Sequence, residues 1–242
     1  MSLAESFASE VSRSLHAQVD GAELLPMTLA KVCVKVLPVA GAGLSMTDEL
    51  RVPLGSSDLD AARAERLQVT LGEGPCLTAT TDGNDESMVF DLAATEAHWP
   101  MFYREILEQT AYRSFASIPL RSPDLPRFGA LDLYSTQTTA LSQILVDEIE
   151  DSIAGLISGM LFAAPTVTYQ HGVTLPTWLN VESVTYRMNV WVAVGMLMEH
   201  ADLTNTDALS VLRAFAFGQS TTLDDIARQI TNRELTAQAV LT

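Results

Sequence analysis

The residues of this sequence that could do chemistry begin with its two cysteines and one glycine-rich turn, GEGPC (72–76). The turn has the glycines of a phosphate-binding loop, but no Gly-Lys-Ser/Thr follows them, so they predict a tight turn instead. Cys76 could be a reactive thiol or a haem ligand, although a lone cysteine beside a leucine is more often a small core residue. The turn therefore indicates structure more than chemistry.

The other chemically versatile residues do not form a motif. The four histidines are scattered, with no H-x-x-x-H or H-E-x-x-H spacing, and the cysteines form no C-x-x-C pair. No G-x-S-x-G motif is present, and no nucleophile stands near a base in the sequence. We therefore expect no metal site, no cofactor and no catalytic residue, and we do not expect an enzyme. The histidines are His16, His98, His171 and His200.

The charge of the chain limits its partners. Thirty acidic residues against fourteen basic ones give the 242 residues a net charge of −16, which repels phosphate backbones at long range. A nucleic-acid role would need a local basic surface, and we expect no DNA partner. The sequence has no apolar run long enough for a membrane span and no signal peptide, so we expect no membrane association. Two cysteines without a disulfide pattern favour the cytoplasm.

The elements that position these residues alternate between helices and strands over the first two thirds of the chain. Their order predicts an α+β domain in which helices flank a central, mainly antiparallel sheet. A proline-bounded stretch without helical period, 164–177, then predicts a linker. The predicted helices are 1–20, 24–38, 59–67, 99–111 and 141–162, and the predicted strands are 41–47, 50–55, 88–93, 114–120 and 128–135.

The first helix has a narrow apolar stripe with a step of four residues. Such a stripe suits docking on another helix, and the same helix of a second subunit would provide one. We therefore expect a homodimer paired through helices 1–20 and 141–162. The stripe consists of Leu3, Phe7, Val11, Leu15 and Val19.

Residues 178–242 show no strand pattern and predict a separate unit of three helices, at 178–201, 205–217 and 223–235. Thr204 with Asp207, and Thr221 or Thr222 with Asp224 or Asp225, form capping boxes at the second and third helices. Gly195 costs its helix roughly 1 kcal/mol relative to alanine, and with Ala193 it predicts that another helix passes close by. The predicted core residues are Val190, Val194, Leu197, Met198, Leu209, Leu212, Phe215, Ala216, Leu223, Ile226, Ala227 and Ile230.

The stretch AVGMLMEHADLTNTDALSVLRAFAFGQSTTLDDIA (193–227) resembles an ANTAR domain. This family is a three-helix module that binds RNA and relieves transcription termination in bacterial regulators. The resemblance implies an RNA surface, for which the candidates are Arg213, Arg187 and Arg228 with Ala193 and Gly195. Ten residues match at the family's spacing: Ala193, Gly195, Leu197, Met198, Ala208, Leu212, Arg213, Ala216, Leu223 and Ala227.

The sequence also departs from the ANTAR pattern. Val194 replaces the family lysine, Leu209 replaces an aromatic residue, and Ser220 replaces an asparagine. Losing the lysine and the asparagine removes a charge and a hydrogen-bonding group that an RNA loop could use. Residues 181–242 hold four basic and seven acidic residues, a balance of 4 − 7 = −3. These departures favour an alternative, a protein-interaction or dimerisation module without RNA contact.

Residues 20–163 resemble a GAF domain, a small-molecule sensor often fused ahead of ANTAR in actinobacterial regulators. The resemblance rests on the element order and on the segments GEGPCL (72–77), DLA…HWPMF (91–102), SIPL (117–120) and GALDLYS (129–135). It implies a pocket for an unknown small molecule. The candidate lining residues are Cys76, Trp99, Phe102, Phe115 and Tyr134.

The two resemblances together predict a ligand-responsive regulator that binds RNA hairpin loops and permits transcription to continue. The expected parts are a helix (1–20), a sensor (21–163), the linker (164–177) and the helical module (178–242). Because some GAF proteins reduce methionine sulfoxide with cysteines, Cys33 and Cys76 leave a thiol redox enzyme as a third hypothesis.

Overall fold

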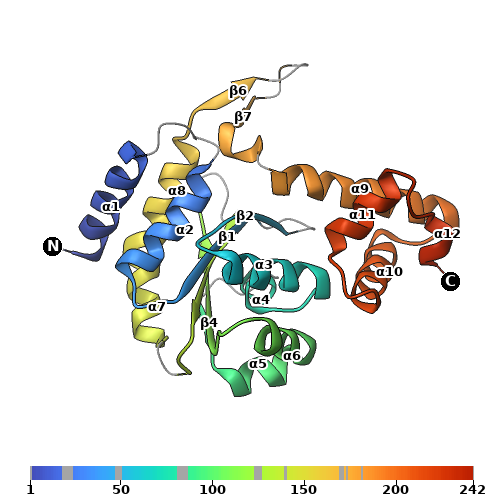
Figure 1. The fold of residues 1–242 in the computed structure, drawn as a ribbon. Helices are drawn as coiled ribbons and strands as arrows, with labels where there is room; N and C mark the ends of the chain where they lie inside the picture. Colours follow the sequence, from blue (N-terminus) through green and yellow to red (C-terminus); the bar gives the residue numbers. More distant parts are fainter. Residues whose placement is uncertain are drawn as a thin grey trace.

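The computed structural model describes residues 2–17, 24–46, 51–80, 87–122, 127–138, 141–168, 172, 174–180 and 182–241. One antiparallel sheet lies between two layers of helices, and a unit of further helices extends from one end of the molecule (Figure 1). In the described part of the chain, no helix combines the length and apolarity needed to cross a membrane.

The sheet has five strands in the order β2-β1-β5-β4-β3, and every neighbouring pair is antiparallel. All residues of β4 and β5 are buried, because helices cover both faces of the sheet at its centre. The predicted α+β fold with an antiparallel central sheet is confirmed. The strands are β1 (Gly41–Met46), β2 (Val52–Ser56), β3 (Met88–Phe90), β4 (Ser114–Leu120) and β5 (Gly129–Ser135).

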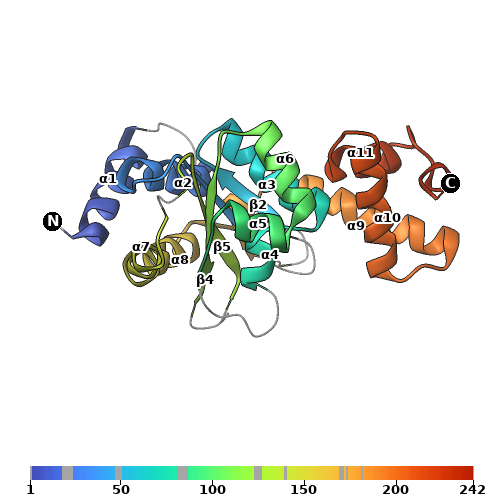
Figure 2. The same cartoon turned by 90° about the horizontal axis from the view of Figure 1, so that it is seen from below.

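Figure 2 shows the two helical layers on opposite sides of the sheet. The helix predicted over 141–162 is continuous but contains a π-helical turn, η2, where hydrogen bonds skip to the fifth residue. The first layer contains α1 (Leu3–Ala17), α2 (Leu25–Val36), α7 (Gln143–Ile149), η2 (Glu150–Ala154) and α8 (Gly155–Phe162). The second contains α3 (Leu59–Leu71), α4 (Pro75–Thr80), α5 (Leu92–His98) and α6 (Pro100–Gln109).

The apolar stripe of α1 docks within the chain. Phe7 and Val11 are buried in the core that α2 and η2 share, and Lys35 of α2 donates to Glu10 Oε1 over 2.7 Å. Leu15 is exposed, and Val19 lies outside the described residues. The partner of this stripe is therefore α2, which corrects the expectation that a second subunit covers it. The homodimer itself stays a prediction.

Two turns of the second layer differ from the sequence prediction for local reasons. Helix α3 continues to Leu71 and ends where Gly72 adopts a φ of +69°, a left-handed conformation that glycine adopts without strain. The strand predicted over 88–93 ends at Phe90, because Asp91 accepts a hydrogen bond from Ala94 N and caps α5. Helix α4, which begins at Pro75, was not predicted.

The stretch predicted as a linker contains a hairpin of β6 (Thr166–Thr168) and β7 (Thr174–Pro176), followed by the 3-10 turn η4 (Thr177–Asn180). Trp178 is buried, and its Nε1 donates to the carbonyl oxygen of Leu161 over 2.8 Å. This contact fixes the end of η4 against α8, so the chain enters the next helix from an anchored position.

The helical module comprises α9 (Glu182–Ala201), α10 (Asn205–Gly218), α11 (Leu223–Thr231) and α12 (Ala237–Val240). Both predicted capping boxes are present: Thr204 accepts from Asp207 N over 3.2 Å, and Thr222 accepts from Asp225 N over 3.1 Å. Helix α11 stops before the predicted end at 235, because Arg233 adopts a φ of +63°. The predicted core residues are buried or packed against the core.

The prediction that another helix passes close to Gly195 is wrong. A Cβ atom placed there would meet nothing within 4 Å, and the residue is exposed, so no other helix passes close by at this position. Ala193, in contrast, is fully buried in the module core. The exposed neighbours Met188, Val192 and Met196 form with Gly195 an apolar strip along α9. Within the described residues, no contact in the fold explains why this helix contains a glycine.

Candidate functional site

Helix α3 connects the sheet with the helical module and is the centre of the candidate site. It packs on β1 and β2 and also contacts α10 (Figure 1). Asp58 starts the helix by accepting hydrogen bonds from Asp60 N and Ala61 N over 2.9 and 3.0 Å. Glu65 and Gln68 lie in the buried cluster on the sheet side of α3, whereas Val69 belongs to the core of the module. A movement of α3 would therefore change the packing of both the sheet domain and the helical module.

On the sheet side, α3 covers a cluster of buried polar residues. Arg51 donates to Glu65 Oε2 over 2.7 Å and also pairs with Asp132. Gln68 Nε2 donates to Asp132 Oδ2 and to the Tyr134 hydroxyl, over 3.3 and 3.2 Å, and that hydroxyl donates to Glu65 Oε1 over 2.5 Å. All five side chains are fully or almost fully buried. A ligand entering here would have to displace these mutual hydrogen bonds.

Burial controls protonation in this cluster. Desolvation raises the pKa of Glu65 to about 8, against the opposing effect of Arg51. The same cause raises the pKa of Tyr134 well above its usual range. Burial also disfavours the charged form of Arg51, but the neighbouring Cys76, Glu65 and Asp132 hold its pKa above the usual value. The raised pKa of Glu65 favours its protonated form near neutral pH, which reduces the surplus of negative charge beside one guanidinium group.

The five residues predicted to line a ligand pocket are all buried beneath the second helical layer. Phe115 packs edge-on against Phe102 and Tyr134, with ring centroids 5.7 and 6.3 Å apart, and Trp99 belongs to the same apolar cluster. The backbone N–H of Cys76 donates to Gln68 Oε1 over 3.1 Å. The residues thus come close together as packed core, and neither cavity described below is lined by any of them.

The two thiols lie in different layers of the fold. Cys33 belongs to α2 and Cys76 to α4, and these helices cover opposite sides of the sheet (Figure 2). Neither forms a disulfide, and both are buried. Desolvation raises the pKa of Cys33 to about 12 and that of Cys76 well above the usual range. In this conformation both thiols are protonated and the sheet separates them.

The module docks on α3 through two hydrogen bonds that join distant parts of the sequence. Arg213 Nε of α10 donates to the carbonyl oxygen of Val69 over 3.2 Å. The backbone N–H of Leu223, at the start of α11, donates to Thr70 Oγ1 over 3.3 Å. The side chain of Val69 is buried in the module core. Burial lowers the pKa of Arg213, so the first RNA-binding candidate is partly desolvated against α3.

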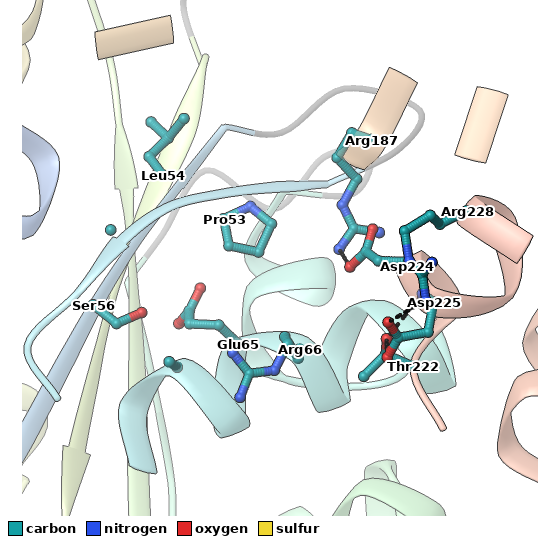
Figure 3. Close-up of a pocket in the computed structure, with 12 residues that line it drawn as sticks. Pro53, Leu54, Ser56, Glu65, Arg66, Arg187, Thr222, Asp224, Asp225 and Arg228 are labelled. Carbon is teal, nitrogen blue, oxygen red and sulfur yellow. Dashed lines mark hydrogen bonds and ion pairs between the residues drawn. The ribbon is translucent and has the colours of Figure 1, made fainter. Parts of the chain in front are cut away.

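Arg187, the second candidate, is also at this junction. Its Nη2 donates to Asp224 Oδ2 of α11 over 2.8 Å, and only 3% of the residue is exposed. Burial lowers its pKa to about 10, although Asp224 favours the charged form. Arg187 and Asp224 line a cavity of about 390 Å³ between β2, α3, α9 and α11. Figure 3 shows them facing each other on the module side, with Glu65 and Arg66 on α3.

The remaining RNA-binding candidates lie in different environments. Arg228 lines the same cavity and pairs loosely with Asp225 and Glu234, at 3.9 and 3.7 Å. Ala193 is in the core, whereas Gly195 is exposed on α9. Two positions that depart from the ANTAR pattern, Val194 and Leu209, are buried in the module core, so those departures affect packing here.

Sequence reasoning missed the polar cluster, the docking residues of α3 and Arg66. A second cavity of about 530 Å³, between α3, α6 and the turn from α10 to α11, is lined by Arg66, Thr70 and Phe217 among others. One signal was available: the alternation in β5 places Asp132 and Tyr134 on one face of a strand whose flanking leucines face the other. No cluster of three potential metal ligands occurs in the part of the chain that is described.

No protein-family model matches the sequence, and no curated protein matches it. Among solved structures, the chain is similar to the GAF domain of an Acinetobacter phosphoenolpyruvate-protein phosphotransferase, with 13% identity and a TM-score of 0.47, over 66% of this chain and 93% of that chain. It is similar to the corresponding GAF domain from Coxiella burnetii, with 15% identity and a TM-score of 0.46, over 66% and 94%.

It is also similar to the free methionine-R-sulfoxide reductase of Neisseria meningitidis, with 15% identity and a TM-score of 0.45, over 66% of this chain and 90% of that chain.

Proposed function

We propose that this chain is a signal-responsive regulator whose GAF-like part controls an ANTAR-like module that binds RNA hairpins and permits transcription to continue. The observation that carries the proposal is the hydrogen bond from Arg213 to the carbonyl oxygen of Val69. The arginine that the sequence resemblance assigns to RNA is held by the sensor part. A docked module of this kind is inactive until the contact opens.

The position of α3 supplies a physical route for the signal. One side of the helix is bound to the polar cluster through Glu65 and Gln68, and the other side holds Arg213 and Leu223 of the module. A ligand that favours one arrangement of α3 would change the fraction of undocked modules. It can do so only by as much as its affinities for the two arrangements differ.

The second candidate function is a protein-interaction or dimerisation module without RNA contact. The apolar strip on α9, made of Met188, Val192, Gly195 and Met196, favours it, because exposed apolar surface commonly marks a docking site. The acidic balance of the module also favours it. The two candidate functions differ in the binding surface: Arg213 would contact RNA in the first, and the apolar strip on α9 would contact a protein in the second.

RNA binding by an undocked protein tests the proposal. Val69→Gln places an amide in the module core and weakens docking without changing the charge. We expect Val69→Gln to bind labelled hairpin pairs with an affinity that falls as salt rises, and the double variant Val69→Gln/Arg213→Ala to bind at least about tenfold more weakly, the loss for one charged contact.

Arg104→Ala in the Val69→Gln background is the matched control, because Arg104 is an exposed arginine of α6. It should leave RNA affinity unchanged. An undocked, folded protein that ignores RNA would refute the proposal and favour the interaction module. Equal losses for the two arginine variants would show that charge alone, and not the Arg213 surface, attracts the RNA.

A further inference from the structure

The cavity at the junction has the size and the position of a ligand site. Its volume of about 390 Å³ is within the usual range for small-molecule pockets. Its walls come from both parts of the molecule: Pro53 and Arg66 from the sheet domain, and Arg187 and Asp224 from the module (Figure 3). An occupant would therefore contact the two parts at once.

Two residues that line this cavity, Arg187 and Asp224, carry buried polar atoms without a hydrogen-bond partner in the part of the chain that the structure describes. Arg187 is almost fully buried, and its Nε and Nη1 have no hydrogen-bond partner among the described residues. Asp224 Oδ1 is likewise buried without a partner. Buried polar atoms are nearly always paired, because leaving them unpaired costs free energy. A ligand that pairs with both residues would accept from the guanidinium and donate to the carboxylate.

The other charged groups of the cavity divide into paired and unpaired ones. Glu65 is held by Arg51 and Tyr134, and Asp225 by the Thr222 hydroxyl and Arg228. Arg66 is exposed and makes no hydrogen bond or ion pair within the described part of the chain, and its charge acts on the Asp224 carboxylate. The N–H groups of Leu223 and Asp225 at the start of α11 are engaged by Thr70 and Thr222. The cations, and not the helix end, would hold an anion.

We propose that this cavity binds a phosphate group that carries an O–H, either free or as part of a small metabolite. Its oxygens accept from Arg187 Nε and Nη1 and from Arg66, and its O–H donates to Asp224 Oδ1. Sulfate has the same shape but no proton to donate at neutral pH. A sulfate oxygen would therefore face the Asp224 carboxylate without a hydrogen between them, and the repulsion would weaken sulfate binding. The carboxylate is thus the selective element, and the arginines provide the attraction.

Binding at this place would hold the module against α3. The ligand would contact Arg66 on the sheet domain and both Arg187 and Asp224 on the module, so it would bind the docked arrangement and not the undocked one. This regulatory consequence rests on the proposed function, in which docking withholds Arg213 from RNA. The binding site itself does not rest on it.

Calorimetric titration of the full chain with inorganic phosphate and with sulfate, at equal ionic strength, tests the site. We expect phosphate to bind at least about tenfold more tightly than sulfate, the ratio for one well-placed hydrogen bond. Glycerol 3-phosphate, titrated in parallel with inorganic phosphate at about pH 6, where roughly half of its phosphate groups keep an O–H, distinguishes the sources. Tighter binding than inorganic phosphate identifies an organic phosphate as the ligand, and weaker binding identifies the free ion.

Two variants assign the binding to this cavity. Arg66→Gln, at an exposed residue, should weaken phosphate binding about tenfold. Arg63→Gln is the matched control, because Arg63 lies on the same helix, pairs with Asp60 and lies outside this cavity; it should change nothing. Asp224→Asn supplies an amide donor, so the preference for phosphate over sulfate should narrow or reverse.

Absence of phosphate binding at millimolar concentration would overturn the proposal. So would equal affinities for phosphate and sulfate, or equal effects of the Arg66 and Arg63 substitutions, since either result indicates nonspecific attraction. These readouts contain no RNA. Failure of the site therefore leaves the regulator proposal standing, and failure of RNA binding leaves the site standing.

Discussion

Arg213 donates a hydrogen bond to the carbonyl oxygen of Val69, a residue 144 positions earlier in the chain, over 3.2 Å. The acceptor is a backbone atom of α3, and Gly72 leaves room for the guanidinium: a Cβ there would lie 2.9 Å from Arg213 Nη1. The contact therefore depends on how α3 ends. It places Arg213, which the sequence resemblance proposes as an RNA contact, against the sheet domain.

Docking of the module on α3 should contribute measurably to the free energy of unfolding. Val69→Ala removes two methyl groups from a position with 1% exposure, so we expect a loss of about 2 kcal/mol in the free energy of unfolding of the module. Val192→Ala, on the exposed strip, should cost less than about 0.5 kcal/mol. Chemical denaturation measures both, and limited proteolysis reports whether the module is released. Equal costs for the two substitutions would contradict the docked arrangement.

The buried carboxyl of Glu65 should make stability depend on pH. Its pKa is about 8 in the folded protein, from a reference value of 4.5. Between these values the folded state holds a proton that the unfolded state has lost, so this residue makes stability fall as pH rises, by at most about 1.4 kcal/mol per pH unit.

Glu65→Gln should flatten that dependence. Denaturation of both proteins between pH 5 and 8 gives the difference in slope. Asp60→Asn, at a partly buried carboxylate on the same helix, is the control. A wild-type slope identical to that of Glu65→Gln would show that Glu65 is ionised throughout.

The exposed glycine of α9 offers a test that separates structure from function. Since a Cβ at Gly195 meets nothing and its φ is not in the left-handed region, Gly195→Ala should stabilise the module by about 1 kcal/mol. If the glycine serves a partner that approaches the helix closely, the same variant should lose RNA or protein binding while gaining stability. A destabilised variant would show that the helix needs the glycine for its own conformation.

The caps of the module are individually testable. Thr204 accepts from Asp207 N at the start of α10, so Thr204→Ala should lower the free energy of unfolding by about 1 kcal/mol. Thr204→Ser retains the hydroxyl and serves as the control. Thermal denaturation compares the two variants, and equal stabilities would mean that the hydroxyl does not support the helix.

Much of the fold could be predicted because periodicity and capping are local properties. Thr204 and Thr222 mark the starts of α10 and α11 by their spacing to Asp207 and Asp225. The alternation in β4 and β5 is weaker, because both strands are buried on both faces, yet turn residues bound them correctly. The end of α11 was missed because Arg233, not a glycine, adopts the left-handed conformation.

The candidate site could not be predicted, because its partners are distant in sequence. Arg51 and Asp132 are 81 residues apart and meet only when β5 lies beside β1. From the sequence alone, Arg187 is expected to be a solvated arginine on a helix face. In the fold, α11 brings Asp224 against it. The resemblance to ANTAR proposed Arg213 as an RNA contact, which stays a prediction, and no local pattern indicates that α3 would accept its hydrogen bond.

The most direct test compares the RNA affinity of the wild-type chain with that of Val69→Gln at one salt concentration, while small-angle scattering records whether the module has left α3. Our account predicts that Val69→Gln is more extended and binds hairpin RNA at least about tenfold more tightly, because undocking frees Arg213. An extended variant whose RNA affinity equals that of the wild type would contradict the central claim that docking on α3 withholds the RNA surface.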